Sequence, residues 1–404
     1  MGWTGDINVF APTAAFNMEV ARFLGIKWLR DLRDGQRPDG AFTDVAPYVP
    51  IVGWGVAGWG DAGVTVPWTV WTRYGDRRVI EENYEAMARW IDYLEANSTG
   101  YLRPPEGYGD WLNVNDETPK DVIATAYFAH SARLLSEMAS TIGREDDARR
   151  YRELFENVRA AFNRAYVDAG GRIAGDTQTA YVLALHMDLL PEGKWEPAAR
   201  RLVSHIEERG WHLSTGFLGT PHLLPVLTEA GYADVAYRLL NQRTFPSWLY
   251  EVERGATTTW ERWDSIKPDG SFNDPAMNSF NHYAYGAGGD WLYRYVAGIS
   301  PAEPGYRRIR IQPHPGGGLN FARASHDSPY RRILSEWRIR GDGFRLRVSI
   351  PPNTTATVCV PARNPREVRI SPRLPQAGPP QLENGCALFE LGSGDYEFRA
   401  RLPG

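Results

Sequence analysis

The stretch that decides the fold of this chain is IEENYEAMARWIDYL, residues 80–94. Five of its large apolar residues recur at regular steps: Ile80, Tyr84, Met87, Ile91 and Leu94. Steps of three and four residues place these side chains on one face of a helix, and the pattern therefore predicts an amphipathic α-helix. Gly100, after Asn97-Ser98-Thr99, is a typical stop signal.

Helical patterns of this kind recur from residue 8 to about residue 298. Further helices are predicted at 11–34, 60–74, 121–142, 145–168, 177–189, 194–209, 218–230, 232–242 and 281–298. Because no strands alternate with them, the pattern argues against a Rossmann or TIM architecture and favours an all-α toroid or bundle. Long loops at 35–60, 101–120 and 243–280 are rich in Trp, Tyr, Gly and Asp, a composition that predicts a binding surface.

The period changes from helix to strand near residue 300. Apolar and arginine residues alternate at 308–311 and at 337–350, where Gly341-Asp342-Gly343 predicts a hairpin turn. Further strands are predicted at 354–360 and 396–401. We therefore expect a mainly α domain at 1–300, followed by a small antiparallel β-sandwich at 301–404.

Composition excludes several classes of protein. The net charge is only -4 over 404 residues, with basic residues dispersed, so nucleic acid and anionic membranes are not expected partners. No apolar run approaches the ~20 residues that span a bilayer. Residues 1–25 lack the pattern of a secretory signal, which favours the cytoplasm. The oligomeric state is not predicted.

The potential metal ligands and thiols do not form a recognisable centre. Cys359 and Cys386 are the only cysteines, and we expect both to be free, buried thiols. The eight histidines form no zinc-binding pattern. No loop matches a calcium motif, and no nucleotide, flavin or pyridoxal phosphate motif is present, so no metal and no cofactor are predicted.

Carboxylates lie beside indole rings in four short segments. These are GWTGD at 2–6, WGD at 59–61, GDW at 109–111 and TTTWERWD at 257–264. Aromatic faces stack on the C–H faces of a pyranose, while carboxylates supply acid, base and hydroxyl-binding groups. The candidate substrate-binding residues are Trp3, Asp6, Trp59, Asp61, Asp110, Trp111, Trp260, Trp263 and His282.

Each candidate also has a purely structural interpretation. Glu261, between two tryptophans and beside Arg262, is the strongest catalytic candidate, yet it could be a surface ion pair flanked by core indoles. Asp6 could simply cap the first helix. A lone histidine such as His282 is more often structural than functional. The tryptophans could all belong to a helical core.

Taken together, these segments resemble bacterial α-L-rhamnosidases. GWTGD, WGDA at 59–62, GDW, GATTTWERW at 255–263 and SFNH at 279–282 follow the order and rough spacing of that family's motifs. The resemblance covers nearly the whole chain and implies an inverting (α/α)6-barrel glycosidase. It implies that Glu261 is the general base and that Asp6, Trp3, Trp59, Trp111 and His282 line the pocket for a terminal rhamnose of a glycoside or oligosaccharide.

One part of the family pattern is not found in this sequence. By the resemblance, the general acid and a further pocket aspartate lie just upstream of Met1. We therefore expect an N-terminally truncated barrel that lacks its first helix. Because a general acid contributes about 10²–10⁴-fold, turnover of natural glycosides is expected to be weak.

Two other functions fit the same residues. Another (α/α)6 sugar enzyme, such as a glucosidase, a trehalase-like hydrolase or an unsaturated glucuronyl hydrolase, shares tryptophan-rich loops but needs a different set of acidic residues. A catalytically silent carbohydrate-binding protein would use the pocket without turnover.

Overall fold

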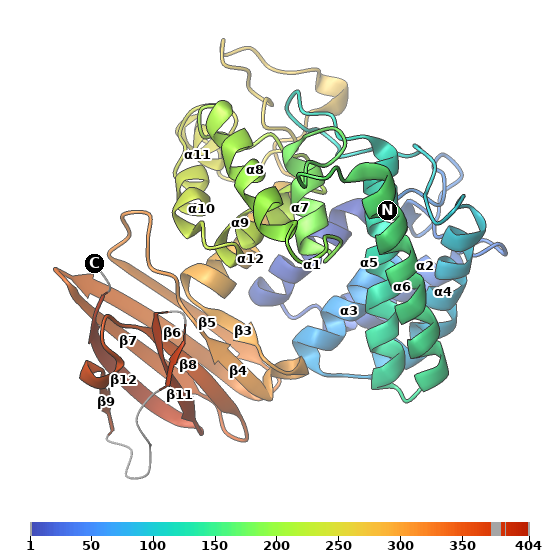
Figure 1. Cartoon of the computed structure of the whole chain (residues 1–404). Coiled ribbons are helices and arrows are strands. Elements are labelled where there is room, and N and C mark those ends of the chain that lie inside the picture. Colours follow the sequence, from blue (N-terminus) through green and yellow to red (C-terminus); the bar gives the residue numbers. More distant parts are fainter. Residues whose placement is uncertain (1, 373–380, 384, 403–404) are drawn as a thin grey trace. The chain divides into compact units, whose positions relative to one another are not determined.

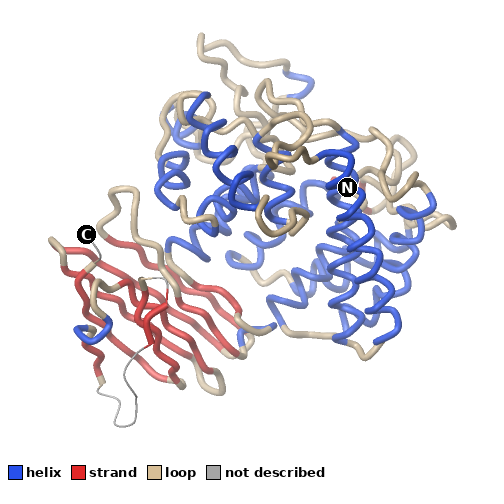
Figure 2. The backbone as a smooth tube through the Cα atoms, viewed as in Figure 1, coloured by secondary structure: helices blue, strands red, loops and turns tan. Residues whose placement is uncertain are grey.

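The computed structural model describes residues 2–372, 381–383 and 385–402, and they form two compact units. The first contains residues up to 13, 20–69 and 77–288, and the second contains 14–19, 70–76 and the chain from 289 onwards. Helices build the first unit and β-sheets dominate the second (Figures 1 and 2).

The helices of the N-terminal part follow one another with loops between them, as predicted. They are α1 Thr4–Asn17, α2 Leu29–Asp34, α3 Ala62–Tyr74, α4 Arg78–Ala96, α5 Lys120–Thr141, α6 Glu145–Tyr166, α7 Gln178–His186, α8 Trp195–Glu208, α9 Thr220–Glu229, α10 Ala233–Leu240 and α11 Trp248–Glu253. The stripe at residues 80–94 lies on the buried face of α4.

Burial divides the helices into an inner and an outer set. Most residues of α5, α7 and α9 are buried, whereas α6, α8 and α10 bury one face. Consecutive helices pack as hairpins, α5 on α6, α7 on α8 and α9 on α10, and α7 also packs on α5 and α9. Helices that are apolar all round belong inside, so this arrangement confirms the predicted barrel of helical hairpins (Figure 1).

Two predicted helices differ from the structure. The stretch 11–34 is interrupted, because α1 ends at Asn17 and a π-helical turn, Phe23–Trp28, leads into α2. The stretch 281–298 contains a 3-10 turn at Ala284–Gly288, the short α12 at Gly289–Trp291 and a π-helical turn at Leu292–Val296. Clustered glycines lower helix propensity there, and a Cβ on Gly286 would lie 3.2 Å from the Phe10 ring.

The second unit contains two five-stranded sheets that pack on each other. One has the order β10-β11-β8-β4-β3 and the other β5-β6-β7-β12-β9. The strands are β3 Ile299–Pro301, β4 Arg308–Ile311, β5 Phe321–Ser328, β6 Arg331–Arg340, β7 Gly343–Ile350, β8 Thr355–Pro361, β9 Arg369–Ser371, β10 Gln381–Glu383, β11 Cys386–Leu391 and β12 Gly394–Arg401.

Strand register confirms the predicted hairpin and corrects one detail. In the pair β6–β7, Trp337 lies opposite Leu346, and both side chains are fully buried. The sheets are otherwise antiparallel, but β4 and β8 are parallel. The chain leaves β4, builds β5, β6 and β7 of the other sheet and then returns to β8 in the same direction, which a local hairpin pattern does not show.

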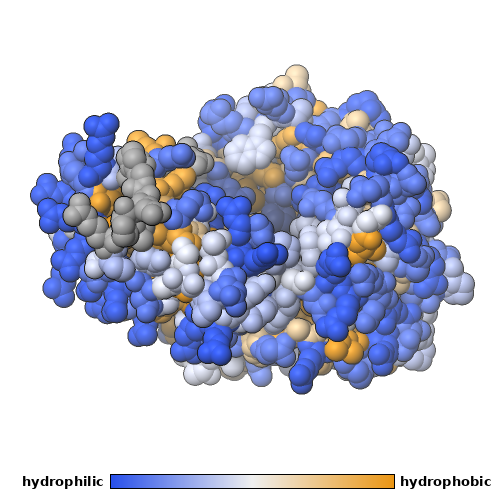
Figure 3. Space-filling model, turned by 90° about the horizontal axis from the view of Figure 1, so that it is seen from below, coloured by the Kyte–Doolittle hydropathy of each residue, from blue (hydrophilic) through white to orange (hydrophobic). Residues whose placement is uncertain are grey.

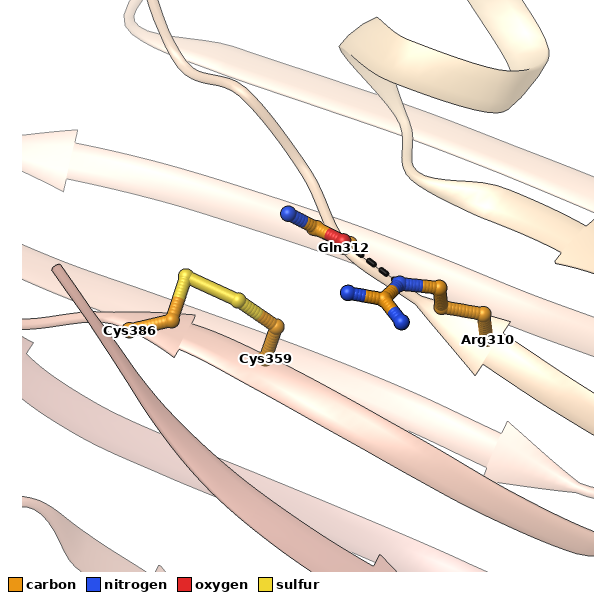
Figure 4. The surroundings of a disulfide bond; sticks show 4 residues. All are labelled: Arg310, Gln312, Cys359 and Cys386. Carbon is orange, nitrogen blue, oxygen red and sulfur yellow. Dashed lines mark hydrogen bonds between the residues drawn. A yellow bond between two sulfur atoms is a disulfide. The ribbon is translucent and has the colours of Figure 1, made fainter. Parts of the chain in front are cut away.

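The prediction of free thiols is wrong, because Cys359 and Cys386 form a disulfide (Figure 4). Cys359 lies in β8 opposite Leu388, and Cys386 lies at the start of β11 opposite Pro361, so the cysteines are diagonal neighbours with Cα atoms 5.3 Å apart. The cysteines are 27 residues apart in the chain. The pairing of β8 with β11 brings them together, and cysteine count alone could not reveal it.

Removing this disulfide should destabilise the β unit. We expect the Cys359→Ala/Cys386→Ala double variant to lose about 2–4 kcal/mol of unfolding free energy, since the cross-link restricts the unfolded chain. Urea unfolding followed by far-UV circular dichroism measures the change. A reducing agent should shift the wild-type transition to that of the double variant and leave the double variant unaffected. Equal stability of all samples would contradict a structural role.

The surface of the protein is mainly hydrophilic, as expected when most apolar side chains are buried. On the face drawn in Figure 3, hydrophilic residues predominate and hydrophobic ones occur in small separate groups. In the part of the chain that the structure describes, no helix has the length and apolar character needed to cross a membrane.

Candidate active site

Three of the predicted tryptophans gather around Tyr108, which the sequence analysis did not single out. The ring centroids of Trp3, Trp59 and Trp111 lie 6.0, 4.8 and 6.1 Å from that of Tyr108, each edge-on. Trp3 is 39% exposed, Trp111 is half-buried and Trp59 is only 3% exposed. These four rings, here called the aromatic wall, therefore extend from the surface into the interior.

The start of the chain is fixed to this wall by Asp44, another residue missed from sequence. Strand β1 (Gly2–Trp3) pairs with β2 (Val45–Ala46), and the backbone N–H and the hydroxyl of Thr4 each donate to the Asp44 carbonyl at 3.0 Å. The Tyr108 hydroxyl donates to Asp44 Oδ2 at 3.1 Å. Burial raises the pKa of Asp44 to about 6, although this hydrogen bond opposes the rise.

Asp6 and His282 meet directly although they lie near opposite ends of the helical region. Asp6, in the first turn of α1, is 6% exposed, and its Oδ1 lies 2.9 Å from Nε2 of His282. Nδ1 of His282 accepts the N–H of Ala284 at 3.3 Å. With Nδ1 acting as an acceptor, Nε2 is the ring nitrogen that faces Asp6 and can donate a hydrogen bond to it. The pair presents polar atoms beside Phe217, whose ring centroid lies 5.4 Å from that of His282.

Glu261 is anchored through one carboxylate oxygen. Its N–H donates to the Ser279 carbonyl at 2.9 Å, and the Ser279 N–H donates to Glu261 Oε2 at 2.8 Å. Among the described residues, none forms a hydrogen bond with Oε1. The side chain is half-buried. Since the His282 N–H donates to the Thr259 carbonyl at 2.9 Å, the Glu261 loop and the Asp6–His282 pair form one assembly.

The indoles on either side of Glu261 lie in the core. Trp260 is 2% exposed and Trp263 is 1% exposed. Trp263 stacks on Tyr285 with centroids 4.1 Å apart, and its Nε1 donates to the Thr215 carbonyl at 3.0 Å. The burial of both indoles fits their structural interpretation, and a contact of either ring with sugar stays a prediction.

Arg262 pairs with Asp264 and not with Glu261. Its Nε lies 2.8 Å from Asp264 Oδ1. Both side chains line a pocket of about 510 Å³ whose other walls include Trp263 and residues 112–115. None of Trp3, Asp6, Trp59, Trp111, Glu261 and His282 lines this pocket.

Asp61 and Asp110 are interior anchors. Asp61 is fully buried and accepts hydrogen bonds from the Gly58 N–H, the Trp90 indole and the Ser131 hydroxyl. Asp110 accepts hydrogen bonds from the Thr179 hydroxyl and from three backbone N–H groups, those of Gly216, Leu218 and Gly219. Burial raises the pKa of both carboxyl groups, and these hydrogen bonds oppose the rise. Each aspartate therefore holds the loop that carries a neighbouring tryptophan of the aromatic wall.

A barrel of helical hairpins that brings together an aromatic wall, a carboxylate–imidazole pair and Glu261 has the architecture of a six-hairpin glycosidase domain. Comparison with known proteins specifies the family. Residues 1–296 match the bacterial alpha-L-rhamnosidase 6 hairpin glycosidase domain, and residues 298–373 match the bacterial alpha-L-rhamnosidase C-terminal domain. The chain belongs to the bacterial alpha-L-rhamnosidase family.

Named relatives agree with this assignment. The chain is 58% identical over 398 residues to an alpha-L-rhamnosidase of Streptomyces avermitilis, covering 98% of this chain and 38% of the relative. The crystal structure of a Streptomyces avermitilis alpha-L-rhamnosidase complexed with L-rhamnose superposes with a TM-score of 0.96 at 58% identity, over 99% of this chain and 38% of that one. An alpha-L-rhamnosidase structure from Dictyoglumus thermophilum gives a TM-score of 0.92 at 32% identity, over 99% and 46% of the two chains. This chain thus spans less than half the length of these relatives.

Proposed function

We propose that this chain forms the site that hydrolyses terminal α-L-rhamnose from glycosides, with inversion at the anomeric carbon. Membership of the family and the 58% identity to a named alpha-L-rhamnosidase support the reaction. In an inverting hydrolase a carboxylate deprotonates a water molecule that attacks opposite the leaving group. Glu261 takes this role.

The observation that supports the proposal most directly is the hydrogen bonding of the Glu261 carboxylate. Oε2 is held by Ser279, while Oε1 has no partner among the described residues, so one oxygen fixes the group and the other is available to a water molecule. The aromatic wall supplies stacking surfaces through Trp3, Trp59 and Trp111. Asp6 and His282 bind sugar hydroxyls as a pair.

The remaining candidates act indirectly. We assign Asp61 and Asp110 to holding the loops of Trp59 and Trp111, because their oxygens are already used by the protein. Trp260 and Trp263 hold the Glu261 loop against the core. The catalytic site then lies in the helical domain, which we place at 1–300, with the β-domain at 301–404.

The disulfide provides evidence on the cellular location of the protein. Disulfides persist mainly in oxidising compartments, so Cys359–Cys386 favours a periplasmic or extracellular location over the cytoplasm that the sequence suggested. Mass spectrometry of alkylated protein from the native host, with and without reduction, tests whether the bond is present there.

A panel of p-nitrophenyl glycosides tests the proposed reaction. We expect release of p-nitrophenolate from the α-L-rhamnoside and none from the glucoside, galactoside or glucuronide. This leaving group needs little protonation, so the assay reports on the base, and NMR should show β-L-rhamnose as the first product. Hydrolysis of another glycoside instead would indicate a different (α/α)6 enzyme. Rhamnose binding without turnover would indicate a silent binding protein.

A further inference from the structure

Helix α11 (Trp248–Glu253) is connected at several points to the loop that carries Glu261. This base loop comprises residues 254–266. The Trp248 ring lies edge-on to Trp263 at 5.3 Å, and the Tyr250 hydroxyl donates to the carbonyl at the loop's end, Ile266, at 2.8 Å. The third connection is Glu251, whose Oε2 accepts the N–H of Trp260 at 3.3 Å.

Glu251 holds the base loop at two places. Its carbonyl accepts the N–H groups of Arg254 and Ala256 at 3.0 and 3.1 Å, where the loop begins. Its carboxyl group binds the peptide N–H of Trp260, directly before Glu261. The residue is only 3% exposed, and its Oε1 is buried without a hydrogen-bond partner. The carboxyl group of Glu251 is therefore hydrogen-bonded to the peptide that precedes Glu261, and it does not face the surface.

The surroundings of Glu251 favour its neutral form. Burial raises its pKa to about 8, and the Trp260 N–H is the main group that opposes this rise. No cation of the described residues forms a salt bridge with it. The titratable group that faces it is Tyr285, whose own pKa is raised well above 10 by burial, so that it is uncharged. Arg262 and Asp264 act on the same tyrosine but neutralise each other as a pair.

We propose that Glu251 is a positioning residue for the reaction: its uncharged carboxyl group fixes the peptide before Glu261 and adds no negative charge next to the base loop. The inference rests on the proposed role of Glu261. Ionisation of Glu251 would leave a buried negative charge without a salt-bridge partner among the described residues, and the hydrogen bond from the Trp260 N–H offsets that cost only in part.

This arrangement has a definite dependence on pH. Between the ordinary glutamate pKa of 4.5 and about 8, the unfolded chain releases a proton that the folded chain retains. The unfolded state then binds fewer protons, so stability falls as pH rises through this window. A glutamine at position 251 keeps an acceptor for the Trp260 N–H and cannot ionise, so it removes this contribution.

The test compares Glu251→Gln, Glu251→Ala and the wild-type chain. Glu253→Gln is the matched control, because Glu253 lies on the same helix but is exposed and pairs with Arg243. At pH 6 we expect Glu251→Ala to lower kcat for p-nitrophenyl α-L-rhamnoside by about 10-fold or more, with KM changed less than about 3-fold, since a displaced base loses rate rather than binding. Glu251→Gln should restore most of the rate.

The pH series supplies a readout that needs no activity. From pH 5 to 8 the melting temperature of the wild-type protein should fall relative to that of Glu251→Gln, whereas Glu253→Gln should follow the wild type. Parallel curves for wild type and Glu251→Gln, or an unchanged kcat in Glu251→Ala, would overturn the proposal. If Glu251→Ala does not fold, the comparison of melting curves between the wild type, Glu251→Gln and Glu253→Gln tests the proposal. Failure of the wild type to cleave any rhamnoside would contradict the proposed function but leave the melting curves able to test the protonation of Glu251.

Discussion

Replacing Glu261 by glutamine should lower kcat for p-nitrophenyl α-L-rhamnoside by about 10²–10⁴-fold, with little change in KM. The amide oxygen can still accept the Ser279 N–H, so the loop keeps its geometry. The amide nitrogen cannot take a proton from water, so only the base function is lost. Steady-state kinetics on purified variants measure both constants.

Azide distinguishes a lost base from a damaged site. In Glu261→Ala, azide can occupy the space of the water and attack without deprotonation, forming a C–N bond as p-nitrophenolate leaves. We expect azide to restore turnover and to give β-L-rhamnosyl azide, the inverted product. Undiminished hydrolysis by either Glu261 variant would exclude this residue as the base. An α-configured azide would contradict single inversion.

Replacing Asp110 by alanine should destabilise the helical unit by about 3–5 kcal/mol. The change leaves the buried N–H groups of Gly216, Leu218 and Gly219 without their acceptor, and each such group costs about 1–3 kcal/mol. The loop 214–219 would loosen, and with it the contact between the Phe217 N–H and the Trp111 carbonyl, 2.9 Å long. Urea unfolding followed by tryptophan fluorescence measures the loss.

Two further variants serve as controls for Asp110→Ala. Asp110→Asn keeps the shape of the side chain but points an amide donor at the N–H groups that need an acceptor. It should therefore lower the free energy of unfolding nearly as much as Asp110→Ala does. Asp234→Ala, at an exposed position of α10, should stay within about 0.5 kcal/mol of the wild type. If Asp110→Ala remains as stable as the wild type and only loses affinity for rhamnose, Asp110 binds the sugar directly and its assignment as an anchor is wrong.

The parts of the fold that were predictable from sequence are those with a local signal. The stripe of α4 and the alternation of β6 and β7 each repeat over enough residues to define their period, and both elements are confirmed. Helix α11 is six residues long, too short for a period to emerge inside a loop rich in aromatic residues. The parallel pair β4–β8 and the disulfide both depend on which distant strands become neighbours, and no local pattern contains that information.

In the candidate site, too, features with a local sequence signal were predicted and those that depend on distant residues were not. Pairing of indoles with carboxylates identified segments that meet in space, because Trp3, Trp59 and Trp111 all contact Tyr108. It could not reveal that the oxygens of Asp61 and Asp110 accept hydrogen bonds within the protein, because both residues follow a glycine and lie near a tryptophan in sequence, as Asp6 does. Tyr108, Asp44 and Glu251 were missed for a related reason, since their importance arises from partners distant in the chain or from burial.

The contact between Asp6 and His282 can form only late in synthesis, because it joins the start of the helical region to its end. The Thr13 hydroxyl donates to the Ala287 carbonyl at 3.0 Å, so two independent contacts join the first helix to the last part of the helical domain. At about 5–20 residues per second, a ribosome needs on the order of tens of seconds to travel from one partner to the other. Throughout that interval Asp6 and Thr13 lack these partners, and both contacts can form only once nearly the entire helical domain has emerged.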